Sequence, residues 1–101
     1  MAETKTTHNY ELILIVPPEV ADEALEAVVN NVSQFITTKG GTIAETQRWG
    51  KKKLAYPLKH YLEGNYILMK LQMAPTLSIE LENHVRITEQ IMRHILVKAG
   101  S

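Results

Sequence analysis

Residues 10–16, which read YELILIV, decide the fold. The run is rich in residues that favour β-strands, and it is far shorter than the ~20 residues of a membrane-crossing helix. Successive side chains of a strand alternate between its two faces. One face would carry Tyr10, Leu12, Leu14 and Val16, and the other Ile13 and Ile15. A strand that is apolar on both faces is usually covered on both sides, which predicts a central place in a sheet.

A helix is expected directly after this strand, at about 19–39. Pro17-Pro18 ends the strand, and Pro18 suits the first helical position, where a missing N–H costs nothing. Acidic residues near the helix start favour its dipole, and apolar residues recur at helical spacing along one stripe. The acidic residues are Glu19, Asp22 and Glu23, and the stripe is Leu25, Val28, Val29, Val32, Phe35 and Ile36. Gly40-Gly41 predicts a left-handed helix end.

The next two elements predict a long β-hairpin. Residues 42–57 form a strand interrupted at Gly50, where a glycine often marks a bulge. Pro57 cannot donate a ladder hydrogen bond, so this strand should lie at a sheet edge. A polar connection that includes Lys59, His60, Glu63, Gly64 and Asn65 should lead to a strand at about 65–73 (NYILMKLQM), again apolar on both faces.

The rest of the chain completes a β-α-β-β-α-β order. Pro75 begins a helix that ends near Arg86-Ile87, and residues 90–98 read as a last strand. This order predicts an α+β, ferredoxin-like domain with a four-stranded antiparallel sheet and both helices on one face. The first and third strands should be central. The domain is expected to span 9–98, with a flexible tail at 1–8 and a frayed end at 99–101.

This architecture leaves one face of the sheet without helices. Its candidate residues are Ile13, Ile15, Tyr66, Leu68, Ile95 and Val97, with Lys70 and Arg93 among them. An open apolar patch usually marks a surface for another protein. A partly exposed sheet and a homodimer face remain alternatives.

Residues 48–57 (RWGKKKLAYP) form the most basic segment. They hold the single tryptophan and four of the 11 basic residues, and no acidic residue occurs from 46 to 62. On a strand, Lys51 and Lys53 point one way and Lys52 the other, so a hairpin can meet phosphates from both sides. Arg48 adds a further charge, and Trp49 and Tyr56 are suited to stacking on unpaired bases. The alternatives are an edge strand protected by lysines, and packing of Trp49 within the hairpin.

Two further cations, Arg86 and Arg93, are also candidate RNA contacts. Arg86 ends the second predicted helix, where a cation is stabilising without any ligand, so a structural role is an equal alternative. The 101-residue chain has zero net charge, which is unusual for a general nucleic-acid coat protein. A neutral chain can still present one basic face.

Catalysis and metal binding have little support. Cysteine is absent, and the four histidines are scattered over different predicted elements without metal-ligand spacing. A small phosphatase would need a phosphate-cradling loop after the first strand. Pro17-Pro18-Glu19 stands there and offers few N–H donors. No cofactor, catalytic residue or metal site is expected. The polar first residues lack the apolar segment of a signal peptide.

Several motifs together resemble one protein family. They are Tyr10-Glu11, Gly40-Gly41, Trp49-Gly50, Lys52-Lys53-Leu54-Ala55-Tyr56-Pro57, Glu63-Gly64-Asn65-Tyr66, and Arg86-Ile87 with Arg93. The chain resembles the family of the sixth protein of the bacterial small ribosomal subunit over about 10–98. The basic pair followed by Leu-Ala-Tyr-Pro is the specific part. Two features depart from the family: no charged C-terminal extension follows, and the N-terminal tail is longer.

The resemblance implies a structural, non-catalytic protein of a cytoplasmic ribosome, or of an organellar ribosome of bacterial descent. It implies binding to the central domain of small-subunit ribosomal RNA, as a heterodimer with the ribosomal protein numbered eighteen. Lys52, Lys53, Arg86 and Arg93 match basic positions of the family. A homodimeric or hetero-partner protein-interaction domain without RNA contact is the alternative function.

Overall fold

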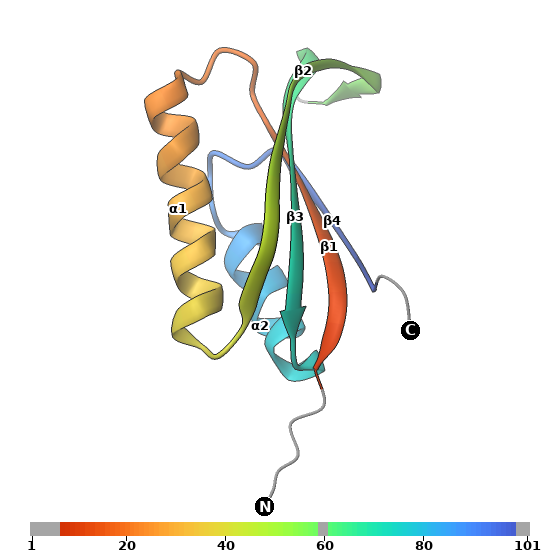
Figure 1. The fold of residues 1–101 in the computed structure, drawn as a ribbon. Helices are drawn as coiled ribbons and strands as arrows, with labels where there is room; N and C mark the ends of the chain where they lie inside the picture. Colours follow the sequence, from red (N-terminus) through yellow and green to blue (C-terminus); the bar gives the residue numbers. More distant parts are fainter. Residues whose placement is uncertain (1–6, 59–60, 99–101) are drawn as a thin grey trace, which may run out of the picture.

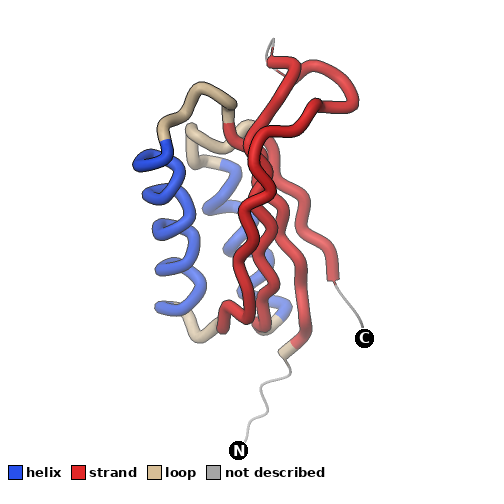
Figure 2. The backbone as a smooth tube through the Cα atoms, turned by 45° about the horizontal axis from the view of Figure 1, so that its top comes forward, coloured by secondary structure: helices blue, strands red, loops and turns tan. Residues whose placement is uncertain are grey.

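The six expected elements are present, in the expected order, in the computed structural model, which describes residues 7–58 and 61–98 (Figure 1). They are β1 (His8–Val16), α1 (Asp22–Thr38), β2 (Thr42–Leu58), β3 (Tyr61–Met73), α2 (Pro75–Arg86) and β4 (Arg93–Lys98). The sheet order is β2-β3-β1-β4 and every neighbouring pair is antiparallel. Both helices cover one side of the sheet (Figure 2). The ferredoxin-like α+β prediction, with β1 and β3 central, is confirmed.

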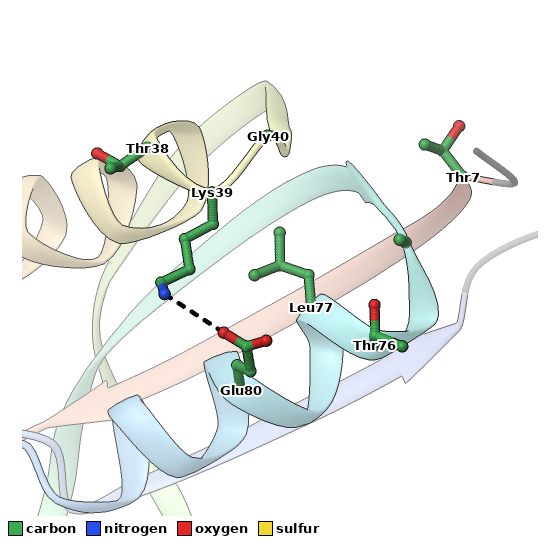
Figure 3. Close-up of a pocket in the computed structure, with 8 residues that line it drawn as sticks. Thr7, Thr38, Lys39, Gly40, Thr76, Leu77 and Glu80 are labelled. Carbon is green, nitrogen blue, oxygen red and sulfur yellow. Dashed lines mark ion pairs between the residues drawn. The ribbon is translucent and has the colours of Figure 1, made fainter. Parts of the chain in front are cut away.

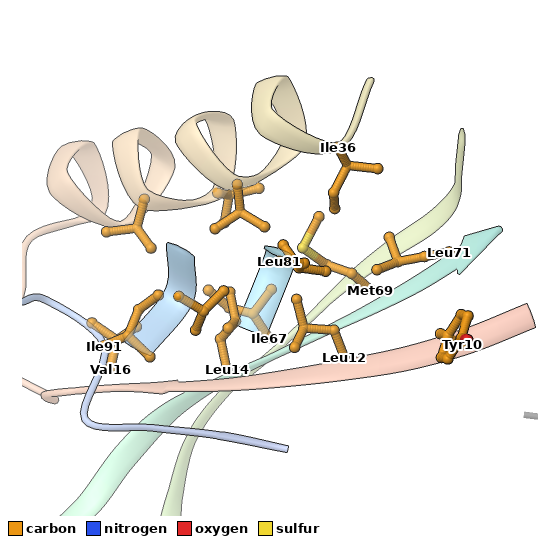
Figure 4. Packing of buried hydrophobic residues seen from close by; sticks show 14 of the residues in the cluster. Tyr10, Leu12, Leu14, Val16, Ile36, Ile67, Met69, Leu71, Leu81 and Ile91 are labelled. Atoms are coloured by element: carbon orange, nitrogen blue, oxygen red, sulfur yellow. The ribbon is translucent and has the colours of Figure 1, made fainter. Parts of the chain in front are cut away.

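The core lies between the sheet and the two helices. Every second side chain of β1 from Tyr10 on and of β3 from Ile67 on belongs to this core, and each of these side chains is buried (Figure 4). They are Tyr10, Leu12, Leu14 and Val16 from β1, and Ile67, Met69, Leu71 and Met73 from β3. The helices contribute Val32 and Ile36 from α1 and Leu81 and Val85 from α2. Each such aliphatic side chain stabilises the fold by about 1.5–3 kcal/mol relative to exposure.

The start of α1 differs from the prediction. The helix begins at Asp22 instead of about residue 19, and Pro18 is not its first residue. The chain makes a turn first, in which the Val20 N–H donates to the Pro17 carbonyl at 3.2 Å. Val20 then packs against the core, and Glu19 is left outside the helix.

The end of α1 confirms the predicted left-handed cap. Gly40 has φ of 96°, a conformation that side chains with a Cβ disfavour. Its N–H donates to Thr37 O at 3.2 Å, and the Gly41 N–H donates to Ile36 O at 2.8 Å. This pair of bonds is the Schellman arrangement, which satisfies the last carbonyls of the helix.

The hairpin of β2 and β3 is longer than predicted. β3 begins at Tyr61 instead of residue 65, so Glu63 and Gly64 pair with Lys53 and Lys52 instead of forming the connection. Of that predicted connection, Lys59 and His60 lie outside the described residues. The hairpin projects beyond the sheet and bends away from the helices (Figures 1 and 2).

Two predicted features of β2 are confirmed, its edge position and its interruption near Gly50. It is an edge strand, and its pairing with β3 shifts between Arg48 and Gly50, where Gly50 has φ of 79°. Trp49 is thus the extra residue of a bulge, which bends the strand and increases its twist. The bulge sits at the base of the projecting part.

The last strand is shorter than predicted, and the first strand begins within the predicted tail. β4 begins at Arg93 instead of residue 90, because a turn at 88–91, closed by Ile91 N–H to Thr88 O at 3.1 Å, buries Ile91. His8, expected in the tail, is the first residue of β1. Thr7, also in the predicted tail, is exposed and lies just before β1, whereas the rest of the tail and the predicted frayed end, residues 1–6 and 99–101, lie outside the described part of the chain.

Candidate RNA and protein interface

The strand register brings the two sets of candidate residues onto one face of the sheet. Ile15 pairs with Tyr66 on one side and with Arg93 on the other, and Tyr66 pairs with Gly50. Side chains directly opposite each other share a face. A row therefore crosses all four strands, from the Trp49 bulge to Arg93. Tyr66, predicted to meet a protein, and Arg93, predicted to meet RNA, lie in the same row.

The open face is smaller than the sequence predicted. In the next row Leu68 and Ile95 flank Ile13, and Val97 lies one row further out. Ile13, Tyr66 and Ile95 are half-buried and Val97 is 46% exposed, but Ile15 is only 3% exposed and Leu68 only 7%. These two predicted surface residues are buried within the chain itself.

Gly64 explains the burial of Ile15. A Cβ added to Gly64 would stand 2.6 Å from Ile15 Cγ2 and 3.4 Å from Met92 Cε. The lack of a side chain at residue 64 thus lets the hairpin backbone pass directly over Ile15. The hairpin itself covers this end of the open face.

Trp49 packs on the same face. Its ring stacks on Tyr66 with centroids 6.4 Å apart and planes 11° apart, and its Nε1–H donates to Gln47 Oε1 at 3.0 Å. Lys52 Nζ stands 5.8 Å from the ring centroid, within cation–π range. The residue remains 41% exposed. The packing alternative for Trp49 therefore holds, and an aromatic surface is still left for a partner.

Lys51, Lys52 and Lys53 differ electrostatically from Lys39, Arg48 and Lys70, each of which pairs with a carboxylate. Opposite them on β3 are Asn65, Gly64 and Glu63, so Lys52 lies on the open-face side and its neighbours on the other. All three are exposed, and within the described residues no carboxylate forms an ion pair with any of them. Their charges are available to a ligand. The side chain of Tyr56 is outside the described part.

Arg48 points to the other side of the sheet. It pairs with the buried Ile67, and its Nη2 contacts Glu26 Oε2 of α1 at 2.8 Å. Its charge is therefore already compensated by an acid of the same chain. A ligand phosphate would have to displace that carboxylate.

Arg86 and Arg93, the other two candidate cations, are far from the hairpin lysines in sequence. Arg86 ends α2, where its Nη1–H donates to Asn83 Oδ1 at 3.0 Å. This contact fits the structural alternative, and the exposed guanidinium remains accessible. Arg93 opens β4 and is exposed on the open face.

Hollows also lie elsewhere on the described part of the molecule. One of about 490 Å³ lies at the opposite end of the molecule from the lysines, between the end of α1 and the start of α2 (Figures 1 and 3). The ion pair of Lys39 and Glu80, at 3.5 Å, closes one side of it. Across residues 7–58 and 61–98, no three potential ligands gather for a metal ion. In the same part of the chain, neither helix has the length and apolar character to cross a membrane.

Comparison with known proteins identifies the family. The sequence model of ribosomal protein S6 matches residues 9–98. The chain belongs to the ribosomal protein S6 family. It is 40% identical over 90 residues to small ribosomal subunit protein bS6 of Fusobacterium nucleatum, covering 89% of this chain and 96% of that protein. The protein of the same name from Moorella thermoacetica is 34% identical, covering 89% and 92%.

A solved structure agrees with this assignment. The crystal structure of 30S ribosomal protein S6 from Thermotoga maritima superposes with a TM-score of 0.86 at 31% identity, covering 92% of this chain and 88% of that one. Family membership confirms a structural protein of the small subunit of bacterial ribosomes, which act in the cytoplasm, and not an enzyme.

Sequence reasoning missed the contacts that the hairpin makes with Glu19, which precedes α1, and with Glu26 of α1. Glu26 meets Arg48, and Glu19 accepts a hydrogen bond of 2.9 Å from the Tyr61 hydroxyl. The only sequence signal was the opposite charge of the two segments. Which acid meets which residue depends on the bend of the hairpin. Tyr61, for example, is 42 residues away from Glu19 in sequence.

Proposed function

We propose that this chain binds the central domain of small-subunit ribosomal RNA as a heterodimer with the ribosomal protein numbered eighteen. One observation carries the proposal. A half-exposed apolar sheet face adjoins a projecting hairpin whose three lysines have no carboxylate partner among the described residues. The first feature suits a protein and the second suits a phosphate backbone.

The protein contact is assigned to the open face. Ile13, Tyr66, Ile95 and Val97 supply its accessible apolar surface. Trp49 stacks on Tyr66, and Arg93 lies in the same row. Tryptophan, tyrosine and arginine are the residues that most often dominate binding energy when they lie within an apolar patch. We therefore assign Trp49 and Arg93 to the protein contact instead of the RNA contact.

The RNA contact is assigned to Lys51, Lys52 and Lys53, with Arg86 as a further cation. Lysine contacts to phosphate are point-charge contacts, which orient a protein on RNA without reading its sequence. A chain of zero net charge should bind RNA weakly alone. The heterodimer presents additional surface, so affinity should increase strongly when the partner is present.

The test is a titration of a labelled RNA fragment spanning the central domain. We expect weak binding of the chain alone and at least tenfold tighter binding with the partner protein. The triple variant Lys51→Ala/Lys52→Ala/Lys53→Ala should lower the slope of log affinity against log salt by about 2 to 3, since each phosphate contact contributes ~0.7–0.9.

A matched control keeps this test specific. Lys39→Ala removes a lysine at the opposite end of the molecule, where it pairs with Glu80. This variant should leave the salt slope unchanged. An unchanged slope for the triple variant as well would exclude the hairpin as the RNA contact. Sedimentation of the isolated chain addresses the alternative function, because a stable homodimer would favour a protein-interaction domain without RNA.

A further inference from the structure

The outer part of the hairpin is paired on one side only. β1 ends at Val16, which pairs with Asn65, so, among the described residues, 61–64 of β3 pair with β2 alone, although Gly64 also packs on Ile15. A two-stranded ribbon is only marginally stable alone and bends easily. Lys52 and Lys53 pair with this part. Strand pairing alone therefore leaves the orientation of Lys52 and Lys53 weakly fixed, and contacts outside the sheet can add to it.

Three contacts reach the hairpin from the segment that joins β1 to α1 and from α1 itself. Asn65 Nδ2 donates to the Pro17 carbonyl at 3.3 Å. The Tyr61 hydroxyl donates to Glu19 Oε2 at 2.9 Å, and Arg48 pairs with Glu26 at 2.8 Å. The two partners of each contact are far apart in sequence: 22 residues separate Glu26 from Arg48, and 48 residues separate Pro17 from Asn65. These contacts are tertiary.

The two carboxylates act on different parts of the hairpin. Glu26 holds Arg48, the residue immediately before the Trp49 bulge, and so restrains the bend. Glu19 holds Tyr61, the first residue of β3, beyond the lysines. One contact lies on β2 at the base and the other on β3 towards the tip. The two contacts thus tie the ribbon to the rest of the chain at two separate places.

We propose that Glu19 and Glu26 are positioning residues for RNA binding, which hold the β2–β3 hairpin so that Lys51, Lys52 and Lys53 keep one orientation towards the RNA. The inference rests on the proposed RNA contact of these lysines. Neither carboxylate touches RNA, and Arg48 serves as the anchor for Glu26 instead of a phosphate ligand. These two acids thus promote RNA binding although they are negatively charged.

The decisive variant is Glu26→Gln, compared with Glu23→Gln. Both change the net charge by the same amount on the same helix, but only Glu26 holds Arg48. The positioning role predicts faster backbone hydrogen exchange in 51–54 and 61–64 for Glu26→Gln. It also predicts RNA binding by the heterodimer that is about two- to fivefold weaker at an unchanged salt slope, the range of a single exposed ion pair. Glu23→Gln should change neither exchange nor affinity.

Tighter instead of weaker RNA binding by Glu26→Gln would overturn the inference. If Arg48 were a phosphate ligand restrained by Glu26, Glu26→Gln would bind RNA more tightly, with a slope steeper by ~0.7–0.9. The exchanged pair Glu26→Arg/Arg48→Glu rebuilds the contact with reversed charges. It should regain wild-type affinity within about twofold under the positioning role, and it should stay weak if Arg48 contacts RNA.

The second contact is tested with Tyr61→Phe, which retains the ring and removes the hydroxyl donor. It should accelerate exchange at 61–64 and weaken RNA binding by about two- to fivefold. Glu19→Gln keeps an oxygen acceptor and should retain most of the affinity. The triple lysine variant could lose RNA binding while Glu26→Gln and Tyr61→Phe have no effect. This result would refute the positioning role alone. No effect of the triple variant would refute the proposed function, and the positioning role with it.

Discussion

The two faces of one sheet have almost the same residue types and opposite surroundings. Leu12 and Leu14 of β1 are fully buried under the helices, whereas Ile13 between them is half-buried on the open face. On β3, Ile67 is fully buried and its neighbour Tyr66 is only half-buried. Strand composition is therefore insufficient to tell the core from an interaction surface. The placement of both helices on one side makes the difference.

The largest expected effect compares two adjacent residues of β1. Leu14→Ala removes a fully buried side chain and should destabilise the fold by about 2–5 kcal/mol, because it leaves a cavity. Ile13→Ala, on the half-exposed face, should cost about 1 kcal/mol. Denaturant unfolding of both variants measures the difference. Equal costs would mean that the open face is packed as tightly as the core.

A second substitution examines why the open face is partly covered. Gly64→Ala would place a Cβ 2.6 Å from Ile15 Cγ2, so the hairpin must shift. We expect a loss of about 1–3 kcal/mol of stability, typical of overpacking. The double variant Gly64→Ala/Ile15→Leu lacks the branch methyl and should recover part of the loss. Additive effects of the two substitutions would contradict this contact.

The third prediction concerns partner binding by the open face. Trp49→Ala should weaken heterodimer formation at least tenfold, or ~1.4 kcal/mol, because it removes the aromatic side chain stacked on Tyr66. Ile79→Ala, an exposed apolar residue of α2 in the helix layer, is the control and should have no effect. Calorimetric titration with the partner protein measures both. Similar losses for the two variants would place the protein contact elsewhere.

The smallest expected effect lies in the hairpin, outside both faces. The hydrogen bond to Glu19, then desolvation and the carboxylate charge, raise the pKa of Tyr61 above its usual 10.0. A raised pKa in the folded state stabilises the protein below pH 10, and this contribution is lost as pH rises through the higher folded value. Absorbance titration should show one phenol ionising late, and Glu19→Gln should move it back towards 10.0.

Many properties of the individual site residues were predictable from the sequence, but which of these residues lie next to each other was not. The bulge at Gly50, the edge position of β2 and the exposure of the three lysines all follow from local chemistry. For Trp49, stacking on a base and packing in the hairpin were equally consistent with the sequence. Only the register, which sets Tyr66 beside the bulge, distinguishes them. Ile15 and Leu68 were expected at the surface and are buried.

By itself the sequence determined the order of the elements, the central place of residues 10–16 and the helix end at Gly40-Gly41. These depend on alternation, periodicity and backbone freedom, which act over a few residues. The tertiary structure alone decided which charges are free. Arg48 and Lys52 read alike in one basic segment, yet the bend of the hairpin brings Arg48 to Glu26 and leaves Lys52 beside Trp49. Ion pairing depends on distances in space, and the bulge at Trp49 places Arg48 and Lys52, which would share a face on a regular strand, on opposite faces of the sheet.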